Sequence, residues 1–519
     1  MRAVPPTRGE LAVRGSSDAS ARSAAAHGGP PTLGIAHETG VELLPNSARV
    51  VARLFVPGLE EVGPTGSRAG AVIDRILKLS ERAVEEAVAD VEARFSFRHR
   101  DLGAIFDANA DKVITLLDPD IALSPVRRRF LGACFTHEYS VEAAALCNPS
   151  MVLFPDTDAT RDAQFVMSVR GIGEGHRSSI GFRTGTITTS GTVSIDTPSP
   201  YAHTVSGTPG RHHRSVFHYK LDLLGDDFEN VAHVLNSLPP TFDDATLTTA
   251  LDAVAADVAI RRLTPTTIAH ITALAHWSYE VRFPADTAIS ERVLWPSAPP
   301  EFHGMEDARF VRFVGDDGAI TYYATYTAFD RRDISVQLLE TTDFVTFSSS
   351  PVAGAAAAGK GLALFPRKVQ GRYLALTRAD RETNGIASSD DLHHWANSET
   401  LQAPRESWEV LQLGNCGSPV ETSHGWLVLT HGVGPVRTYT MGALLLDLDE
   451  PTRVLRRATL PLLAAGTQHR DGYVPNVVYS CGAVAHGDTL VIPYGVSDER
   501  ISIATVSVDE LVAAMVDVR

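Results

Sequence analysis

Cysteine is scarce in this chain: its 519 residues include only four, Cys134, Cys147, Cys416 and Cys481. No two of them have the short spacing of a zinc site, and so few thiols in so long a chain do not make a disulfide framework. We therefore expect core thiols in a protein of a reducing compartment.

Long apolar runs and an excess of basic residues are also missing. No stretch approaches the roughly 20 apolar residues that span a bilayer. The first 36 residues, rich in Ala, Arg, Ser, Gly and Pro, lack the apolar segment of a secretion signal. The formal net charge of −16 argues against nucleic acid or an anionic membrane as the main partner. We predict a cytoplasmic protein, with import into an organelle as the alternative, and a disordered tail over residues 1–48.

Residues 49–147 carry a helical pattern. Apolar residues recur at helical spacing from Ile73 to Phe95, and a second helix is expected over 108–117. Ser124 followed by proline is a good start for a third helix, which we expect to carry apolar residues as far as Leu146. We predict a helical N-terminal region that serves packing, oligomerisation or the shaping of a cleft.

A repeat of paired strands begins near residue 148. Five apolar runs are each followed by a short loop and a second strand; they cover 165–170, 322–327, 373–378, 426–431 and 490–495. The last four runs start 51 to 64 residues apart. Such a period in five copies is typical of radial β repetition, so we predict a mainly β chain with a five-bladed β-propeller over residues 148–519. A two-sheet sandwich is the structural alternative.

A longer interval separates the first two runs and contains helical patterns over 226–236, 243–263 and 267–278. We predict a helical insertion at about 226–283 between the first two blades. Its apolar faces need a partner, and the N-terminal helices are the expected one.

Residues 303–310 (HGMEDARF) concentrate polar chemistry at the start of a predicted strand. Asp307 would lie at the mouth of this strand, with Glu306 beside it and Arg309 two places on. A carboxyl group held beside an arginine can be tuned for proton transfer by burial and charge. Taken alone, a surface turn paired with Arg309 is the simpler interpretation.

The final positions of the five runs are predicted to project toward one ring. They are Arg170, Thr327, Arg378, His431 and Gly495. Arginine offers forked donors that suit phosphate or carboxylate. With Lys360, this ring predicts a channel that places an anion or holds a hydroxyl-rich ligand, and aromatic residues such as Tyr439 offer flat surfaces to sugar rings.

Two other motifs carry little weight. His212-His213 and His393-His394 are adjacent pairs without the helical spacing of metal ligands, so we expect them to be exposed and predict no metal site. The glycine-rich stretch 171–175 opens no helix and is predicted to be a hairpin loop rather than a nucleotide loop.

Five segments together resemble glycoside hydrolase family 130, the family of β-mannoside phosphorylases and β-mannosidases on five-bladed propellers. In chain order they are 303–310 (HGMEDARF), 364–368 (LFPRK), 425–432 (GWLVLTHG), 442–449 (GALLLDLD) and 472–482 (GYVPNVVYSCG). The resemblance covers roughly residues 148–519. It implies cleavage of β-mannosidic bonds in manno-oligosaccharides with inversion, by phosphorolysis to mannose 1-phosphate.

The resemblance also implies roles for individual residues. Asp307 would be the proton donor to the glycosidic oxygen, directly or through a sugar hydroxyl. Inorganic phosphate, the co-substrate, would be held by four residues: Arg378, Lys360, His431 and Tyr439. The residues expected to contact sugar are Glu306, Arg170, Asp498 and Tyr494. No cofactor is expected, and the helical regions offer surfaces for a homo-oligomer.

The chain departs from the family pattern at Glu421, where the phosphorylases usually carry a lysine. An inverting hydrolase needs a base that activates water opposite the acid. Glu421 or Asp380 could serve as this base, so hydrolysis is the second hypothesis. A sugar-binding propeller without turnover is the third.

Overall fold

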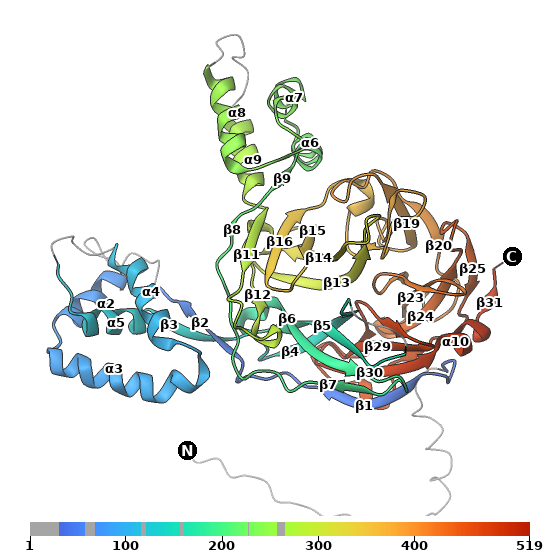
Figure 1. Ribbon diagram of the computed structural model, residues 1–519, viewed down its shortest axis with the longest axis horizontal. Coiled ribbons are helices and arrows are strands. Elements are labelled where there is room, and N and C mark those ends of the chain that lie inside the picture. The colour runs from blue at the N-terminus through green and yellow to red at the C-terminus, as the bar shows by residue number, and fades with distance from the viewer. Residues whose placement is uncertain are drawn as a thin grey trace, which may run out of the picture.

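The computed structural model describes residues 31–57, 68–115, 121–155, 160–226, 228–256 and 265–518. As predicted, the chain is mainly β. Four sheets of four to eleven strands surround a common centre, and two helical parts project from them (Figure 1). Within the described ranges, no helix is long and apolar enough to cross a membrane.

The largest sheet has eleven strands in two antiparallel groups, joined by the parallel pairing of Gly304 with Ser178. The first group comprises β4 (Ala145–Leu153), β5 (Ala163–Ile172), β6 (Ser178–Ile187), β7 (Val193–Ile195) and β12 (Val293–Leu294). The second group comprises β13 (Gly304–Val314), β14 (Ile320–Phe329), β15 (Ile334–Thr341), β16 (Thr346–Pro351), β11 (Tyr279–Arg282) and β8 (Thr208–Pro209). The stretch 171–175 covers the end of β5 and part of the turn that leads to β6, so it lies in a hairpin as predicted.

Three further sheets complete the β part. The four-stranded sheet contains β17 (Ala363–Leu364), β18 (Tyr373–Thr377), β19 (Asn384–Ser389) and β20 (Glu399–Gln402). The seven-stranded sheet contains β21 (Gln412–Asn415), β22 (Val420–Thr422), β23 (Gly425–Gly434), β24 (Thr438–Leu446), β25 (Val454–Arg457), β26 (Leu463–Ala464) and β31 (Val516–Asp517). The five-stranded sheet contains β27 (Val478–Tyr479), β28 (Val484–His486), β29 (Thr489–Val496), β30 (Arg500–Ser507) and β1 (His37–Leu43), and the helix α10 (Val508–Ala514) follows β30.

Strand β1 corrects the expectation of a disordered tail over residues 1–48. Its backbone pairs antiparallel with β30, so residues 37–43 close the last sheet. Composition alone misses this strand, because the partner that satisfies its backbone groups lies more than 450 residues away. Residues 1–30 lie outside the described ranges.

The apolar core lies within and between the sheets. β23 is buried along its whole length, which explains its nearly continuous apolar sequence. Three of the four cysteines are buried and all four are free thiols, in keeping with the prediction of core thiols.

The N-terminal part is helical, as expected, and is framed by a two-stranded sheet of β2 (Val50–Leu54) and β3 (Thr136–Ser140). Its helices are α2 (Arg68–Leu77), α3 (Glu81–Phe95), α4 (Leu102–Ile114) and α5 (Pro125–Cys134). The Ser124 side chain caps α5, but this helix ends at Cys134 instead of continuing toward Leu146. The helix stops there because residues 136–140 form strand β3 and pair with β2.

The helical insertion consists of α6 (Arg214–Leu223), α7 (Phe228–Ser237), α8 (Asp244–Ala256) and α9 (Pro265–Ala275). It begins earlier than the predicted residue 226, and residues 279–282 at its predicted end form strand β11. The expected partner was wrong: the insertion packs a core of its own, with Phe217, Leu235 and Ile271 buried together. Figure 1 shows it standing apart from the N-terminal helices.

Candidate active site

Asp307 lies at an irregularity in the pairing of β13 with β14. The register shifts between Glu306 and Arg309, and Asp307 adopts a left-handed backbone with φ of 54°. Such a bulge re-aims side chains, and a non-glycine residue in this conformation must be held by its surroundings. Glu306 and Asp307 therefore both reach the same group of charged side chains.

The turn before β13 is held by a buried carboxylate. Glu301 is fully buried and accepts hydrogen bonds from the hydroxyls of Tyr279 and Tyr326 and from the backbone N–H groups of Ser297 and Ala298. These contacts fix the segment that leads into Glu306 and Asp307. The Tyr326 side chain thus faces the core instead of the centre at which the ends of the five runs were predicted to meet.

We call the first half of the site the acid side: Glu306, Asp307 and Asp498 together with Arg170. The Arg170 guanidinium lies 2.7 Å from a Glu306 oxygen and 3.5 Å from an Asp307 oxygen. Lys360 reaches the other Glu306 oxygen at 2.6 Å. Both Glu306 and Asp307 are thus matched by cations.

Two opposing effects act on the pKa of Asp307. Burial raises the pKa, but a group of neighbouring cations lowers it more strongly, so it lies below its ordinary value. These cations are Lys360, Arg309, Arg170 and Arg378. Without a ligand, Asp307 is therefore a carboxylate at neutral pH.

Asp498 has the opposite shift. It follows β29 at a turn with a left-handed φ of 47°. Burial raises its pKa to about 6, the Arg170 cation opposes this, and the negative charge of Asp307 adds to it. The acid side therefore holds two coupled carboxyl groups, of which Asp498 takes up a proton more readily.

We call the other half the cation side: Arg378, His431, Tyr439 and Asn415. The Arg378 Nη1 donates to His431 Nε2 over 3.1 Å. Burial, followed by the charge of Arg378, lowers the pKa of His431 well below its ordinary value, so the imidazole is neutral. Within the described ranges, no carboxylate lies within 4 Å of the Arg378 guanidinium to form an ion pair.

Several polar atoms on the cation side are buried without a hydrogen-bond partner among the described residues. They are Arg378 Nε, His431 Nδ1, Asn415 Nδ2 and Asn415 Oδ1. An orphaned buried polar group costs about 1–3 kcal/mol, so a cluster of them marks a place that a polar ligand would complete.

Gly414 lets Arg378 and His431 approach each other. A Cβ atom at this position would lie 2.4 Å from His431 Cε1 and 2.8 Å from Arg378 Cδ. Neither Gly414 nor Asn415, which share strand β21, is predicted from the sequence. No pattern in the sequence marks this short strand, because its role depends on β23 pairing beside it.

Arg309 and Tyr479 connect the two sides. Arg309 donates to the Tyr479 hydroxyl over 2.9 Å and lies 3.8 Å from Asp307. The ring of Tyr479 meets that of His431 edge-on at 5.0 Å, and the ring of Tyr439 stacks on His431 at 6.0 Å. Tyr479 was not predicted, although it lies within the GYVPNVVYSCG segment.

Three predicted site residues lie elsewhere. Tyr494 is buried in the core of the last sheet, where its hydroxyl donates to Glu38 on β1 over 3.4 Å, because the alternation of β29 turns it away from the centre. Glu421 is paired with Arg367 at 2.6 Å. Asp380 accepts hydrogen bonds from Thr383 and the backbone of its own turn. Neither Glu421 nor Asp380 joins the acid side or the cation side.

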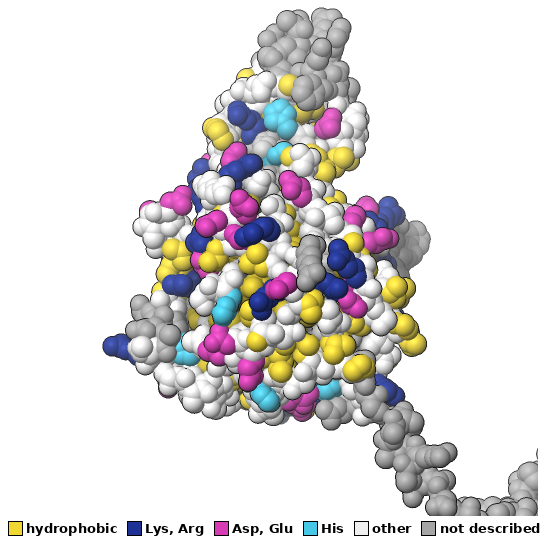
Figure 2. All heavy atoms as spheres, turned by 90° about the vertical axis from the view of Figure 1, so that its right-hand side faces the viewer, with side chains coloured by type: hydrophobic (Ala, Val, Ile, Leu, Met, Phe, Trp, Pro, Cys, Tyr) yellow, Lys and Arg dark blue, Asp and Glu magenta, His cyan; other side chains and the backbone are white. Residues whose placement is uncertain are grey.

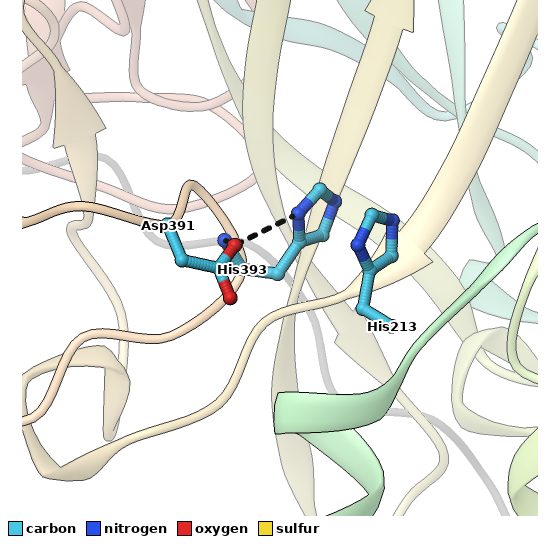
Figure 3. A group of neighbouring side chains, drawn as sticks. All are labelled: His213, Asp391 and His393. Atoms are coloured by element: carbon cyan, nitrogen blue, oxygen red, sulfur yellow. Dashed lines mark hydrogen bonds and ion pairs between the residues drawn. The ribbon is translucent and has the colours of Figure 1, made fainter. Parts of the chain in front are cut away.

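The histidine pairs are less exposed than predicted, and His213, His393 and His394 lie at the contact between the insertion and the sheets. His212 and His393 are buried, and the rings of His213 and His393 stack at 3.4 Å, with Asp391 beside His393 (Figure 3). Burial first, and then the nearby His393, lower the pKa of His213 to about 3.

These three side chains are close enough to suggest a metal site. However, imidazole lone pairs lie in the ring plane, and two rings only 14° from parallel aim them side by side instead of at one ion. The arrangement fits a packing contact between residues 213–215, where α6 begins, and the turn after β19.

A cavity of about 590 Å³ opens beside the cation side. Lys360, Arg378 and Gln412 line it, together with residues of α6 that include Tyr219 and Lys220. The insertion thus borders the route to the site.

Comparisons with known proteins agree on one kind of enzyme. The family described as beta-1,4-mannooligosaccharide phosphorylase matches residues 268–517. A 1,2-beta-oligomannan phosphorylase of Thermoanaerobacter sp. (strain X514) is 32% identical over 41% of this chain and 71% of its own length. A beta-1,2-mannobiose phosphorylase of Listeria innocua serovar 6a is 33% identical over 42% of this chain and 62% of its own length.

Solved structures give a looser likeness. The beta-1,2-mannobiose phosphorylase from Listeria innocua, in complex with beta-1,2-mannobiose, superimposes with a TM-score of 0.44 at 21% identity. The match covers 73% of this chain and 93% of that structure.

Proposed function

Because the chain belongs to glycoside hydrolase family 130, the family of mannoside phosphorylases, we propose that it cleaves a β-mannosidic bond with inorganic phosphate and inverts the anomeric carbon. The products are α-mannose 1-phosphate and the sugar released from the other side of the bond. The relatives' names mention both β-1,2 and β-1,4 linkages, so both belong in the test.

The observation that carries this proposal is the contact of Arg378 with His431. Two nitrogen groups face each other at 3.1 Å, no carboxylate pairs with them among the described residues, and further polar atoms beside them lack partners. A phosphate dianion supplies both the missing charge and several acceptor oxygens. Arg378, His431, Tyr439 and Lys360 are its proposed ligands.

Asp307 is the proposed proton donor, and its lowered pKa has a place in the mechanism. The cations that keep it ionised include Lys360 and Arg378, which phosphate would neutralise in part. Phosphate binding therefore raises the pKa of Asp307 and favours its protonated form.

The bond changes follow from this arrangement. Asp307 gives its proton to the glycosidic oxygen, directly or through a sugar hydroxyl, while the bond from that oxygen to the anomeric carbon breaks. A phosphate oxygen forms the new bond to this carbon from the opposite face. Phosphate is already an anion and needs positioning and charge compensation rather than a base.

Glu306, Arg170 and Asp498 are the proposed contacts to the mannosyl ring. Asp498 and Glu306 offer carboxylate oxygens to sugar hydroxyls, and Arg170 holds Glu306 in place at 2.7 Å. The two coupled carboxyl groups, Asp307 and Asp498, would share the proton uptake of the acid side.

We also propose that the sheets form the five blades of one propeller. The five repeated runs fall in β5, β14, β18 with its last residue beyond it, β23 and β29, one in each antiparallel group. The ends of three of these runs supply Arg170, Arg378 and His431. A crystal structure would test the blade count.

The test uses β-1,2-mannobiose and β-1,4-mannobiose, each with and without phosphate. Phosphorus NMR should show α-mannose 1-phosphate appearing in proportion to the disaccharide consumed, and no reaction without phosphate. Free mannose as the only product, formed equally without phosphate, would establish hydrolysis instead. Binding of mannobiose with no product under either condition would point to a sugar-binding protein.

A further inference from the structure

We call the cavity beside the cation side the access cleft. Most of the charged residues that line it are cations. Its charged residues are Lys220, Arg332, Lys360, Arg378, Arg381 and Asp333. They come from helix α6, the turn between β14 and β15, and the loops around β17 and β18. Segments that are distant in sequence thus place five cations and one carboxylate around a cavity of about 590 Å³.

Most of these cations lack a carboxylate partner. Lys360 pairs with Glu306, but among the described residues no acidic group lies within 4 Å of the charged ends of Lys220, Arg332 or Arg381. Asp330, near Arg332, accepts backbone N–H bonds from its own turn instead. Lys220 lies over the ring of Trp277 at 5.3 Å.

The rest of the molecule has the opposite character. The formal net charge is −16, so the protein as a whole repels anions. Acidic and basic side chains intermingle over the face in Figure 2, without a large area of one sign. The access cleft is a local reversal of the overall charge.

We propose that the access cleft is the route by which phosphate reaches the site, and that Lys220, Arg332 and Arg381 attract and hold the anion on its way to Arg378. This inference rests on the proposed function. Clefts lined by charge of one sign focus the field and raise the local concentration of the oppositely charged ligand.

The geometry of inversion supports this assignment. Phosphate must attack from the face opposite the departing sugar, so its site lies across the anomeric carbon from the leaving group. The access cleft opens at Arg378 and Lys360, the side of the nucleophile. Because α6 contributes Lys220, the helical insertion has a role in co-substrate binding.

The experiment measures phosphate binding and the phosphate dependence of the rate in a variant that loses two cleft charges, Arg332→Gln with Arg381→Gln. Both residues are exposed and outside the cation side. At low ionic strength we expect the KM for phosphate and the phosphate Kd from calorimetry to rise about tenfold, while kcat and the KM for mannobiose stay unchanged. At about 0.5 M salt the difference should fall below about twofold, because salt screens exposed charges.

The matched control is Arg82→Gln with Arg94→Gln, which removes the same charge from exposed positions on α3. It should leave phosphate binding unchanged. An equal effect in both double variants, or none in the cleft variant, would overturn the proposal.

The calorimetric readout separates this proposal from the proposed function. If the cleft variant weakens phosphate binding but the wild-type protein forms no mannose 1-phosphate, the proposed function fails and the access cleft stands. If mannose 1-phosphate forms and the double substitution leaves the KM for phosphate unchanged, the access-cleft proposal fails and the proposed function stands.

Discussion

On the acid side of the site, Glu306 and Asp307 each have a cation within ion-pair distance, whereas on the cation side Arg378 faces the neutral His431. Both sides are built from similar elements, the ends of neighbouring strands and the loops between them. Glu306 and Asp307 are thus matched by cations before any ligand arrives. Among the described residues, the cation side keeps an unmatched charge and four buried polar atoms without partners, whereas the acid side has one such atom, Arg170 Nε.

The two sides also hold their titratable groups in opposite states of charge. Asp307 is kept ionised by surrounding cations, and His431 is kept neutral by burial and by Arg378. An anion on the cation side would move both groups toward their protonated forms. Each side would therefore respond to a bound anion through the same charge.

The largest effect should come from Asp307→Asn, which removes the acid but keeps the shape of the side chain. We expect kcat for phosphorolysis to fall by about 10³-fold or more, because general acid catalysis contributes about 10²–10⁴-fold. Initial rates of mannose 1-phosphate release measure this. Glu421→Gln and Asp380→Asn are the controls and should keep most of the activity. A comparable loss in either control would restore the hydrolytic hypothesis and its base.

Arg378→Gln tests the cation side directly. It removes a charge that has no carboxylate partner among the described residues, so we expect kcat/KM for phosphate to fall about 10²-fold while mannobiose binding changes little. Varying phosphate at saturating mannobiose separates the two constants. A fall confined to the KM for mannobiose would place Arg378 on the sugar instead.

Gly414→Ala is a subtler change to the same side. The new Cβ would lie 2.4 Å from His431 and force it away from Arg378. We expect about a tenfold rise in the KM for phosphate, since misplaced ligands lose favourable geometry. Gly103→Ala is the control, because its Cβ would meet Arg129 at an ordinary 3.5 Å. An unchanged KM for phosphate in Gly414→Ala would show that the Arg378–His431 contact is not needed.

The smallest effect concerns stability and the acid side. The folded pKa of Asp498, about 6, lies above the value near 4 of an unfolded aspartate. Protonated Asp498 therefore favours the fold below pH 4, and this advantage is lost as the pH rises through 6. Asp498→Asn keeps the group neutral, so it should raise the free energy of unfolding at pH 7.5, by at most about 2 kcal/mol because the side chain is half-buried and partly screened.

Urea unfolding of the Asp498→Asn variant at pH 4 and at pH 7.5 measures this difference. The gain should be much smaller at pH 4, where Asp498 is protonated in the folded state and about half protonated in the unfolded state. Asp252→Asn, on the exposed face of α8, is the control and should show no such pH dependence. A gain of the same size at both pH values would mean that the charge of Asp498 costs the fold nothing.

Much of the local architecture follows from sequence patterns. The Ser124 cap, the hairpin after β5 and the β character of the second half were predicted from residues that act on their neighbours. Strand β1 and the end of α5 were not, because both depend on a distant or later strand that pairs with them. The insertion was expected against the N-terminal helices, yet it buries its apolar faces within itself.

The candidate site shows the same division. The positions of Arg170, Arg378 and His431 at the ends of repeated runs predicted that they converge. Tyr494 lies one place before the end of such a run and faces the core, since one residue of register decides to which side a strand residue points. Gly414 and Asn415 carried no signal, because their importance comes from what packs against them.

The sequence by itself determined the repeated strands, the family segments and the presence of an acid among arginines. Only the tertiary structure decided which charges are balanced. Arg170 meets Glu306 across 136 residues of chain and Arg378 meets His431 across 53. Electrostatic energy depends on separations of a few ångströms in a partly buried setting, and these distances exist only after segments far apart in the chain have packed together.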